Sequence, residues 1–315
     1  MQKFLLDGNE CLPQYNVATI GFFDGVHRGH CHLIKMVTDV ARAQGKESMV
    51  ITFAIHPRQV VDETYQPLLL NFPDEKLIRL SQTGIDHCVV LPFDHKMADM
   101  TAREFMEKVL RDKLGVATLV MGYDNRFGHG RLEGFDDYVR YGHELGIEVV
   151  QATALRMEEQ QVSSSVIRQL VIAGDIERAN ELLGYPYTLA GHVVAGFQQG
   201  RKLGFPTANL DITGCEKIIP APGVYAVKAR VEGQMEMKRA IMNIGTRPTL
   251  DNGAQTLETH IINFEADLYG ERLLVALNKR LREERRFDSV GQLVAQMRED
   301  TRMANEFFDK EFEYE

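Results

Sequence analysis

The sequence predicts two domains: an α/β domain with a doubly wound parallel sheet over residues 1–184, and a small all-β domain, a closed barrel, over residues 185–315. The chain has 315 residues, enough for two domains of roughly 150 residues each. Apolar runs of strand length alternate with helical patterns through the first half, whereas strands follow one another after residue 185. The composition, with 44% hydrophobic and 26% charged residues, is typical of folded globular proteins.

The α/β prediction rests on short apolar runs rich in β-branched residues, as in buried parallel strands. These runs are Val17–Ile20, Met49–Phe53, Cys88–Leu91, Ala117–Met121 and Ile147–Val150. After the first run, a helical repeat is formed by His30, Leu33, Ile34, Val37 and Ala41. Farther along, Thr101 and Glu104 form a capping box, which predicts the start of another helix.

In the second half, two short helical patterns, Val166–Ile172 and Ile176–Leu183, end at a Gly-Tyr-Pro sequence. The strands that we expect after it are Gly191–Gly196, Gly223–Val227, Arg239–Asn243 and Leu257–Phe264, separated by Gly, Pro and Asn turns. A last helix is capped by Asp288 or Ser289, and one of its faces carries Val290, Leu293, Val294 and Met297.

Several classes of protein are excluded by composition. The net charge of −9, from 36 basic and 45 acidic residues, argues against a protein that coats nucleic acid. No apolar run approaches the ~18 residues of a membrane span, and acidic residues follow the first six residues too soon for a signal peptide, so we expect a cytoplasmic protein with no membrane partner. The cysteines form no Cys-x-x-Cys pair, and we expect small buried side chains at Cys11, Cys31, Cys88 and Cys215. Nothing in the sequence indicates a protein partner.

The first motif is GFFDGVHRGH, residues 21–30, directly after the first strand. In open parallel sheets, ligands bind at the carboxyl ends of strands, where a helix N-terminus attracts phosphate. His27 and His30 are three residues apart, so on a helix they share a face and can both donate to phosphate oxygens. Glycines that let the backbone approach a ligand stand at 21, 25 and 29. The alternatives are a surface pair, or half of a zinc site that would need a third ligand.

A second anion-binding segment comes later in the same domain. Ser163, Ser164 and Ser165 begin a helix that carries Arg168, although serine runs are also ordinary helix caps. The two segments together resemble the nucleotidylyltransferase superfamily, whose signatures are His-x-Gly-His after the first strand and Ser-Ser-Thr-x-x-Arg near the domain's end. Ser165 stands where Thr is usual and keeps the hydroxyl.

The resemblance implies direct displacement of pyrophosphate from ATP, with catalytic roles for His27, His30 and Arg168. The ATP contacts that it implies are Gly21, Phe23, Asp24, His27, His30, Ser163, Ser164 and Arg168. The segments TFAIHP and GYDNRFG are similar to those of the subgroup that adenylylates FMN, which implies flavin contacts from His56, Pro57, Asp124, Asn125 and Arg126. Members of that subgroup often carry Phe at the position of Asn125, and residues 124–126 are otherwise interpretable as a strand-end turn.

The second motif is GRKLGFPTANL, residues 200–210. The chain contains neither a P-loop nor a Gly-x-Gly-x-x-Gly sequence, so a kinase would need another scaffold. Thr207 and Asn209 are two residues apart, and in an extended segment their oxygens point to the same side. Such oxygens suit Mg²⁺, whereas the alternative is a plain turn.

With GVYAV, NIGTRPT and a Glu before DLYG, this run resembles the riboflavin kinase signature. The resemblance implies a six-stranded barrel with a C-terminal helix, and Mg²⁺ and ATP held by Thr207 and Asn209. It places Gly196, Lys202 and Gly204 near the ATP phosphates, and Glu258 as the base that deprotonates riboflavin. Glu258 is otherwise an edge-strand residue facing solvent, and relatives often have Arg where this chain has Asn305.

Both signatures in one chain resemble the bifunctional riboflavin kinase/FAD synthetase family. The resemblance implies two ATP- and Mg²⁺-dependent reactions, riboflavin to FMN and FMN to FAD. One alternative is a flavin-binding regulatory protein that kept the fold and lost the chemistry. Another is a different nucleotidylyltransferase, such as one acting on pantetheine phosphate, which would leave the second motif without a role.

Overall fold

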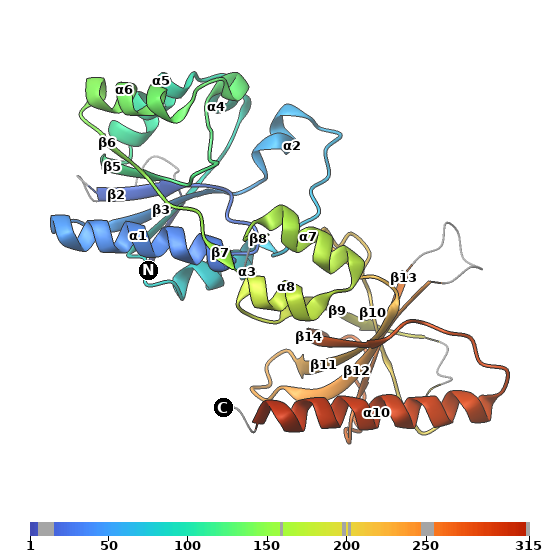
Figure 1. Cartoon of the computed structure of the whole chain (residues 1–315). Helices are drawn as coiled ribbons and strands as arrows, with labels where there is room; N and C mark the ends of the chain where they lie inside the picture. The colour runs from blue at the N-terminus through green and yellow to red at the C-terminus, as the bar shows by residue number, and fades with distance from the viewer. Residues whose placement is uncertain (6–15, 158–159, 197–199, 201–202, 247–254, 313–315) are drawn as a thin grey trace. The chain divides into compact units, whose positions relative to one another are not determined.

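The computed structural model describes residues 1–315 apart from 6–15, 158–159, 197–199, 201–202, 247–254 and 313–315 (Figure 1). The chain divides into two compact units, Met1–Ser164 and Ser165–Glu315. The first contains a six-stranded parallel sheet with helices, and the second a closed six-stranded barrel followed by a helix. The predicted fold class is therefore confirmed.

The sheet of the first unit has the strand order β1-β4-β3-β2-β5-β6, and all of its neighbouring strands run parallel. Its strands are β1 (Gln2–Leu5), β2 (Asn16–Ile20), β3 (Ser48–Phe53), β4 (His87–Leu91), β5 (Val116–Met121) and β6 (Glu148–Gln151). The five predicted strands are confirmed. β1 is an addition that pairs with β4 at one edge. The prediction that all five runs are buried is wrong for β6, which is an edge strand with a partly exposed face.

Helices cover both faces of this sheet, as Figure 1 shows for α1 on one face and α5 and α6 on the other. The helices are α1 (Arg28–Gln44), α2 (Pro57–Val61), α3 (Pro73–Ser81), α4 (His95–Ala98), α5 (Ala102–Phe105) and α6 (Phe135–Leu145). The unit also has a π-helical segment Met106–Arg111, a 3₁₀ turn His129–Arg131, and a short antiparallel pair of β7 (Arg156–Met157) and β8 (Gln160–Gln161). The Thr101–Glu104 capping box is present at the start of α5.

The cysteines differ from the expectation of small buried side chains. Cys88 is buried in β4, and burial raises the pKa of its thiol to about 11. Cys31 is exposed on α1, and Cys215 is half-buried, so the expectation is wrong for these two. Cys11 lies outside the described residues.

The second unit begins with α7 (Ser164–Ala173) and α8 (Ile176–Leu183) and continues as the barrel. Around the barrel the order is β10-β13-β12-β11-β14-β9, with all pairs antiparallel. The strands are β9 (Tyr187–Val194), β10 (Ala208–Leu210), β11 (Gly223–Val231), β12 (Lys238–Thr246), β13 (Gln255–Ile261) and β14 (Arg272–Arg282). β14 has no counterpart among the strands expected from the residue pattern, and by pairing with both β11 and β9 it closes the barrel.

The last helix, α10 (Val290–Phe312), starts where predicted, and the Ser289 hydroxyl accepts a hydrogen bond from the Gln292 N–H. Val290 is 61% exposed, so the apolar face that packs on the barrel lies farther along the helix. There, Ala304 and Phe308 are fully buried in a cluster with residues of β11 and β12. Among the described residues, none of the helices is both long and apolar enough to cross a membrane.

Replacing Phe308 with alanine is expected to destabilise the second unit by about 3–5 kcal/mol, the usual effect of truncating a buried aromatic side chain. Urea unfolding followed by loss of the second unit's far-UV signal measures this. Met235→Ala is the control, because Met235 is 95% exposed and its truncation should change stability by less than about 0.5 kcal/mol. Equal midpoints for the two variants would contradict the packing described here.

Candidate active sites

The loop after β2 leads directly into α1 and carries the first motif. His27 has extended backbone angles and is the N-cap of α1, and its Nδ1 accepts a hydrogen bond of 3.3 Å from the His30 N–H. The prediction that both histidines lie on one helical face is therefore wrong for His27, which lies just before the helix. Because Nδ1 is engaged, His27 can donate to a phosphate only through Nε2.

The two imidazole rings nevertheless lie together. They stack with centroids 3.7 Å apart, and the ring of Phe23 packs edge-on against His30 at 5.1 Å. His27 and Phe23 are buried, with 4% and 3% of their surfaces exposed. The predicted pair is thus a stack of two rings after the carboxyl end of strand β2, where a parallel sheet binds its ligands.

The backbone of this loop is strained. Phe23 has φ 55° and Val26 has φ 34°, values that bulky and β-branched residues rarely adopt. Such strain persists only where surrounding contacts hold it, and it concentrates at functional sites. The loop conformation is therefore maintained by its neighbours.

The serine segment before α7 adjoins this loop. The Ser164 hydroxyl donates to the carbonyl oxygen of Asp24 at 2.9 Å. A Cβ on Gly29 would lie only 3.0 Å from the carbonyl oxygen of Val162, so the absence of a side chain lets the segment approach α1. Ser164 and Asp24, far apart along the chain, therefore meet within the first unit.

Asp24, predicted to contact ATP, has a structural role in the loop. Its buried carboxylate accepts hydrogen bonds from the backbone N–H groups of Leu70 and Asn71 at 3.0–3.1 Å. The side chain thus fastens the loop to the segment that enters α3. A contact with ATP from Asp24 stays a prediction.

Lys76 on α3 is a functional candidate that the sequence did not reveal. It is only 5% exposed, and its Nζ donates to the carbonyl oxygens of Phe22 and Phe53 at 3.2 and 3.0 Å. Burial lowers the pKa of Lys76 to about 8, although the nearby Asp24 carboxylate and Cys88 thiol act in the opposite direction. At neutral pH the amine is therefore still mostly protonated.

The predicted flavin contacts lie in two loops of the first unit. His56 is the N-cap of α2, Pro57 is its first residue, and the His56 ring packs on those of Phe22 and Tyr65 at 4.7 and 5.3 Å. Asn125 donates from Nδ2 to the carbonyl oxygen of Ile20 at 2.5 Å, which ties the end of β5 to the end of β2. The flanking Asp124 and Arg126 are exposed.

Three other residues of the second anion-binding segment lie at the start of α7. Ser163 and Ser165 flank the start of α7, and Arg168 lies one turn into this helix in the second compact unit. Their contacts with ATP stay predictions.

In the barrel, the last three residues of the second motif form β10, which pairs with β13 on one side and β9 on the other. Asn209 of β10 stands directly opposite Glu258 of β13, and Asn243 of β12 stands opposite Glu258 on its other side. Directly opposed residues of antiparallel strands point to the same face. The carboxylate is thus flanked by two amides.

Two cavities lie beside the start of β10. One, of about 300 Å³, is lined by Glu258 and Asn243 and by apolar side chains that include Phe287, Leu293 and Met297. Glu258 therefore faces a cavity, while its neighbours Leu257 and Thr259 are buried in the barrel. The face of α10 that we expected from the sequence contributes Leu293 and Met297 to the wall.

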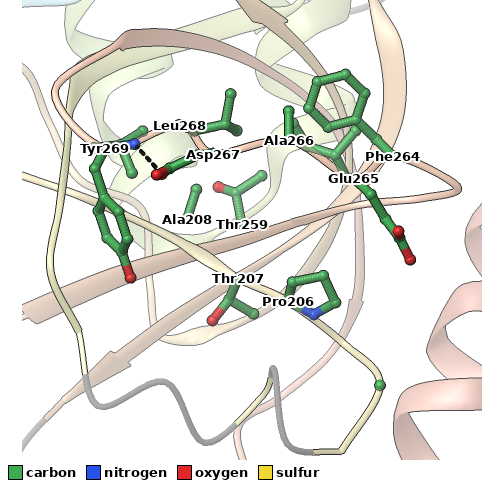
Figure 2. A pocket seen from close by; sticks show the side chains of 13 residues that line it. Pro206, Thr207, Ala208, Thr259, Phe264, Glu265, Ala266, Asp267, Leu268 and Tyr269 are labelled. Carbon is green, nitrogen blue, oxygen red and sulfur yellow. Dashed lines mark hydrogen bonds between the residues drawn. The ribbon is translucent and has the colours of Figure 1, made fainter.

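The second cavity, of about 460 Å³, contains Gly204, Pro206 and Thr207 from the second motif. Figure 2 shows Tyr269 and Phe264 on opposite sides of the view, with Thr207 and Pro206 below them. Thr207 lines both cavities. Among the described residues, Thr207 is thus the wall residue that the two cavities share.

Other residues of this region hold the cavity walls. A Cβ on Gly196 would overlap the Asn209 amide, so only glycine leaves room for it. Arg282 of β14 donates from Nε and Nη2 to the buried Asp300 of α10 at 2.9 and 2.8 Å, and both residues line the smaller cavity. Lys202, predicted near the phosphates, lies outside the described residues. Asn305 accepts a hydrogen bond from Arg239 at 3.5 Å.

Among the described residues, no group of three or more His, Cys, Asp or Glu side chains is placed to hold a metal ion. Threonine and asparagine oxygens, as at Thr207 and Asn209, belong to a different ligand class.

Two family models match the chain along most of its length. The model described as FAD synthetase matches residues 10–166, and the model described as riboflavin kinase matches residues 183–308. Each match contains one of the two motifs, with residues 21–30 in the first and 200–210 in the second.

Curated relatives resemble the chain over nearly its full length. A bifunctional riboflavin kinase/FMN adenylyltransferase of Escherichia coli strain K12 is 36% identical over 93% of this chain and 92% of its own. Proteins of the same name are 36% identical in Pseudomonas fluorescens, over 88% of both chains, and 32% identical in Bacillus subtilis, over 93% and 92%. A crystal structure described as a macrolide-efflux protein from Streptococcus pneumoniae has a TM-score of 0.86 and 30% identity, over 96% of this chain and 98% of that one.

Proposed function

The chain belongs to the bifunctional riboflavin kinase/FMN adenylyltransferase family, and we propose that each of its two reactions takes place at one of the two sites described above. The chain phosphorylates riboflavin with ATP to give FMN, and it adenylylates FMN with ATP to give FAD. The observation that carries the assignment of the kinase site is that Thr207 lines both barrel cavities. Phosphoryl transfer requires two substrates to meet at one point.

The smaller cavity is the riboflavin site in this proposal. Its apolar lining from Phe287, Leu293 and Met297 suits a flat aromatic ring, and Glu258, which lines the same cavity, suits the ribityl 5′-hydroxyl. A carboxylate within hydrogen-bond reach takes the proton as that oxygen attacks the γ-phosphate of ATP. ATP occupies the larger cavity, with its phosphates at Gly204 and Thr207.

Mg²⁺ fits the donor set between the two cavities. Thr207 offers a hydroxyl, and Asn209 offers an amide oxygen opposite the Glu258 carboxylate, all hard oxygen ligands. The ion neutralises the charge of the ATP phosphates when bound. We propose that Thr207 and Asn209 hold it, and that Gly196 and Lys202 lie near the same phosphates.

Thr207→Ala is expected to raise the Mg²⁺ concentration for half-maximal kinase activity at least about tenfold, because one ligand is worth roughly 1.4 kcal/mol or more. Initial rates of FMN formation across a Mg²⁺ titration measure this. Thr213→Ala, which removes an exposed hydroxyl six residues along, is the control. An unchanged magnesium dependence in Thr207→Ala would contradict the metal role.

At the adenylyltransferase site, we propose that His27, His30 and Arg168 hold the triphosphate, with Ser163 and Ser164 at the same anion. The phosphate of FMN then attacks the α-phosphorus of ATP and pyrophosphate leaves, so no covalent intermediate with the protein is needed. The histidine stack stabilises charge that develops on the phosphorus oxygens. His56, Pro57, Asp124 and Arg126 are the flavin contacts in this proposal, and the Asn125 amide supports the loop.

We place the boundary between the catalytic modules after Gly184, which assigns residues 1–184 to adenylyl transfer and 185–315 to the kinase. The start of the riboflavin kinase match at residue 183 supports this boundary. The need for ATP in both reactions supports a cytoplasmic location.

Incubation with riboflavin, ATP and Mg²⁺, followed by chromatographic separation of flavins over time, tests the function. We expect FMN to appear first and FAD after it. Absence of both products would favour a regulatory flavin-binding protein, for which no comparison gives support. The description as a macrolide-efflux protein belongs to the solved structure, and we do not carry it over to this chain.

A further inference from the structure

The strained loop between β2 and α1 is fastened at two points to the same part of the first unit. On one side of Phe23, the Asp24 carboxylate accepts from the backbone N–H groups of Leu70 and Asn71. On the other side, the Phe22 carbonyl oxygen accepts from Lys76 Nζ at 3.2 Å. Leu70, Asn71 and Lys76 belong to one short segment that ends in α3, so the loop is bound to a single support.

Lys76, which makes the second of these attachments, is almost fully buried. Its Nζ donates to the Phe22 and Phe53 carbonyl oxygens and lies 3.3 Å from Thr52 Oγ1, and it sits 4.2 Å from the centre of the Phe22 ring. Thr52 Oγ1 also donates to the Phe22 carbonyl oxygen at 3.2 Å. Hydrogen bonds from a charged donor to buried carbonyls are among the stronger ones in proteins. The amine thus joins the carboxyl ends of β2 and β3.

Both strand ends lead to predicted substrate contacts. After β2 come Phe23 and the histidine stack, where the Phe23 ring lies against His30. After β3 comes His56, whose ring lies against that of Phe22. A displacement of Phe22 would therefore shift the ATP side through Phe23 and the flavin side through His56.

Strain at Phe23 makes this support necessary. A non-glycine residue keeps a backbone angle of φ 55° only where surrounding contacts hold it. The neighbour Asp24 is held by the N–H groups of Leu70 and Asn71, and the neighbour Phe22 is held by Lys76 and Thr52. Loss of Lys76 leaves the Phe22 carbonyl with only one of these two donors.

We propose that Lys76 is a positioning residue for adenylyl transfer, which holds residues 22–24 in the conformation that presents the His27–His30 stack to ATP and His56 to the flavin. The inference rests on the proposed function of this loop as the adenylyltransferase site. Lys76 acts through Phe22 and makes no contact with the reacting atoms in this role.

The test compares Lys76→Met, which keeps the length and removes the charge, with Lys76→Arg, which keeps a cation with several donors. FAD formation is measured with FMN supplied directly, and FMN formation is measured in the same preparations. We expect Lys76→Met to lower the kcat of adenylyl transfer by about 10- to 100-fold, since a misplacement of about 1 Å has effects of this size. The KM for ATP should change less than kcat, Lys76→Arg should stay within about fivefold of wild type, and kinase rates should be unchanged.

Leu80→Ala is the matched control, because Leu80 is fully buried one turn farther along α3, in the core cluster that also contains Phe23, and its truncation loosens this packing without removing a hydrogen bond to the loop. Rates are compared below the unfolding temperature of every variant. The inference is overturned if Lys76→Met stays within twofold of wild type, if Lys76→Arg is as impaired as Lys76→Met, or if Leu80→Ala loses as much kcat. Wild-type protein that makes no FAD would instead refute the proposed function.

Discussion

Replacing Glu258 with glutamine should lower the rate of FMN formation by about 10²- to 10⁴-fold, the usual contribution of a general base. The amide has the same shape as the carboxylate but cannot accept the proton of the riboflavin hydroxyl at neutral pH. Because Glu258 lies on β13 between Asn209 and Asn243, the substitution leaves the strand pairing intact. Adenylyl transfer to supplied FMN should continue at the wild-type rate.

The measurement uses two substrates with one preparation, riboflavin for the kinase and FMN for the adenylyltransferase. Glu236→Gln is the control, since the Glu236 side chain is 75% exposed and lines neither cavity. If Glu258→Gln impaired both reactions equally, the assignment of the reactions to separate sites would be wrong. If Glu236→Gln lowered FMN formation as much, the choice of base would be wrong.

Replacing His30 with alanine should give the opposite pattern, in which FMN accumulates from riboflavin and FAD formation falls by about 10²- to 10³-fold. The substitution removes a donor to the triphosphate and also the partner of the His27 ring, which lies 3.7 Å away in the stack. The His30 backbone N–H still reaches His27 Nδ1, so the start of α1 is retained.

Chromatography of flavins over time distinguishes accumulation of FMN from a general loss of activity. His32→Ala is the control, because His32 lies two residues along α1 and contacts Thr153 instead of the loop. A loss of FMN formation in His30→Ala would indicate a folding defect that reaches the second unit. Equal losses of FAD formation in His30→Ala and His32→Ala would contradict the proposal that His30 binds the triphosphate.

The fold class can be predicted from the sequence because the apolar residues of most strands are also the residues that the fold buries. The central strands β2 to β5 are apolar runs with both faces covered, and these runs are visible without a structure. β14 was not predicted because buried and exposed residues do not alternate regularly along it. Its pairing with β11 has register shifts at Val224–Tyr225 and Ala226–Val227, which break that alternation. β1 is short, and its strand conformation comes from its partner β4.

The candidate sites were predictable as motifs but not as geometry. The three-residue spacing correctly predicted that His27 and His30 lie close together, but the reason was wrong. His27 caps α1 and is not a residue within the helix. Lys76 carried no sequence signal, because one lysine on an amphipathic helix is usually exposed and only the fold buries it beneath the loop. The Asn125 amide looked like a departure from a flavin contact, and the structure gives it a bond to β2.

The order of strands around the barrel also determines when each site can form during synthesis. β9, the first barrel strand in sequence, pairs with β14, the last, so that Tyr187 meets Leu277. The barrel therefore cannot close until residues up to Arg282 have left the ribosome, whereas the sheet of the first unit is complete at Gln151. A nascent chain would thus complete the residues that we assign to adenylyl transfer, 1–184, well before the barrel that we assign to the kinase can close.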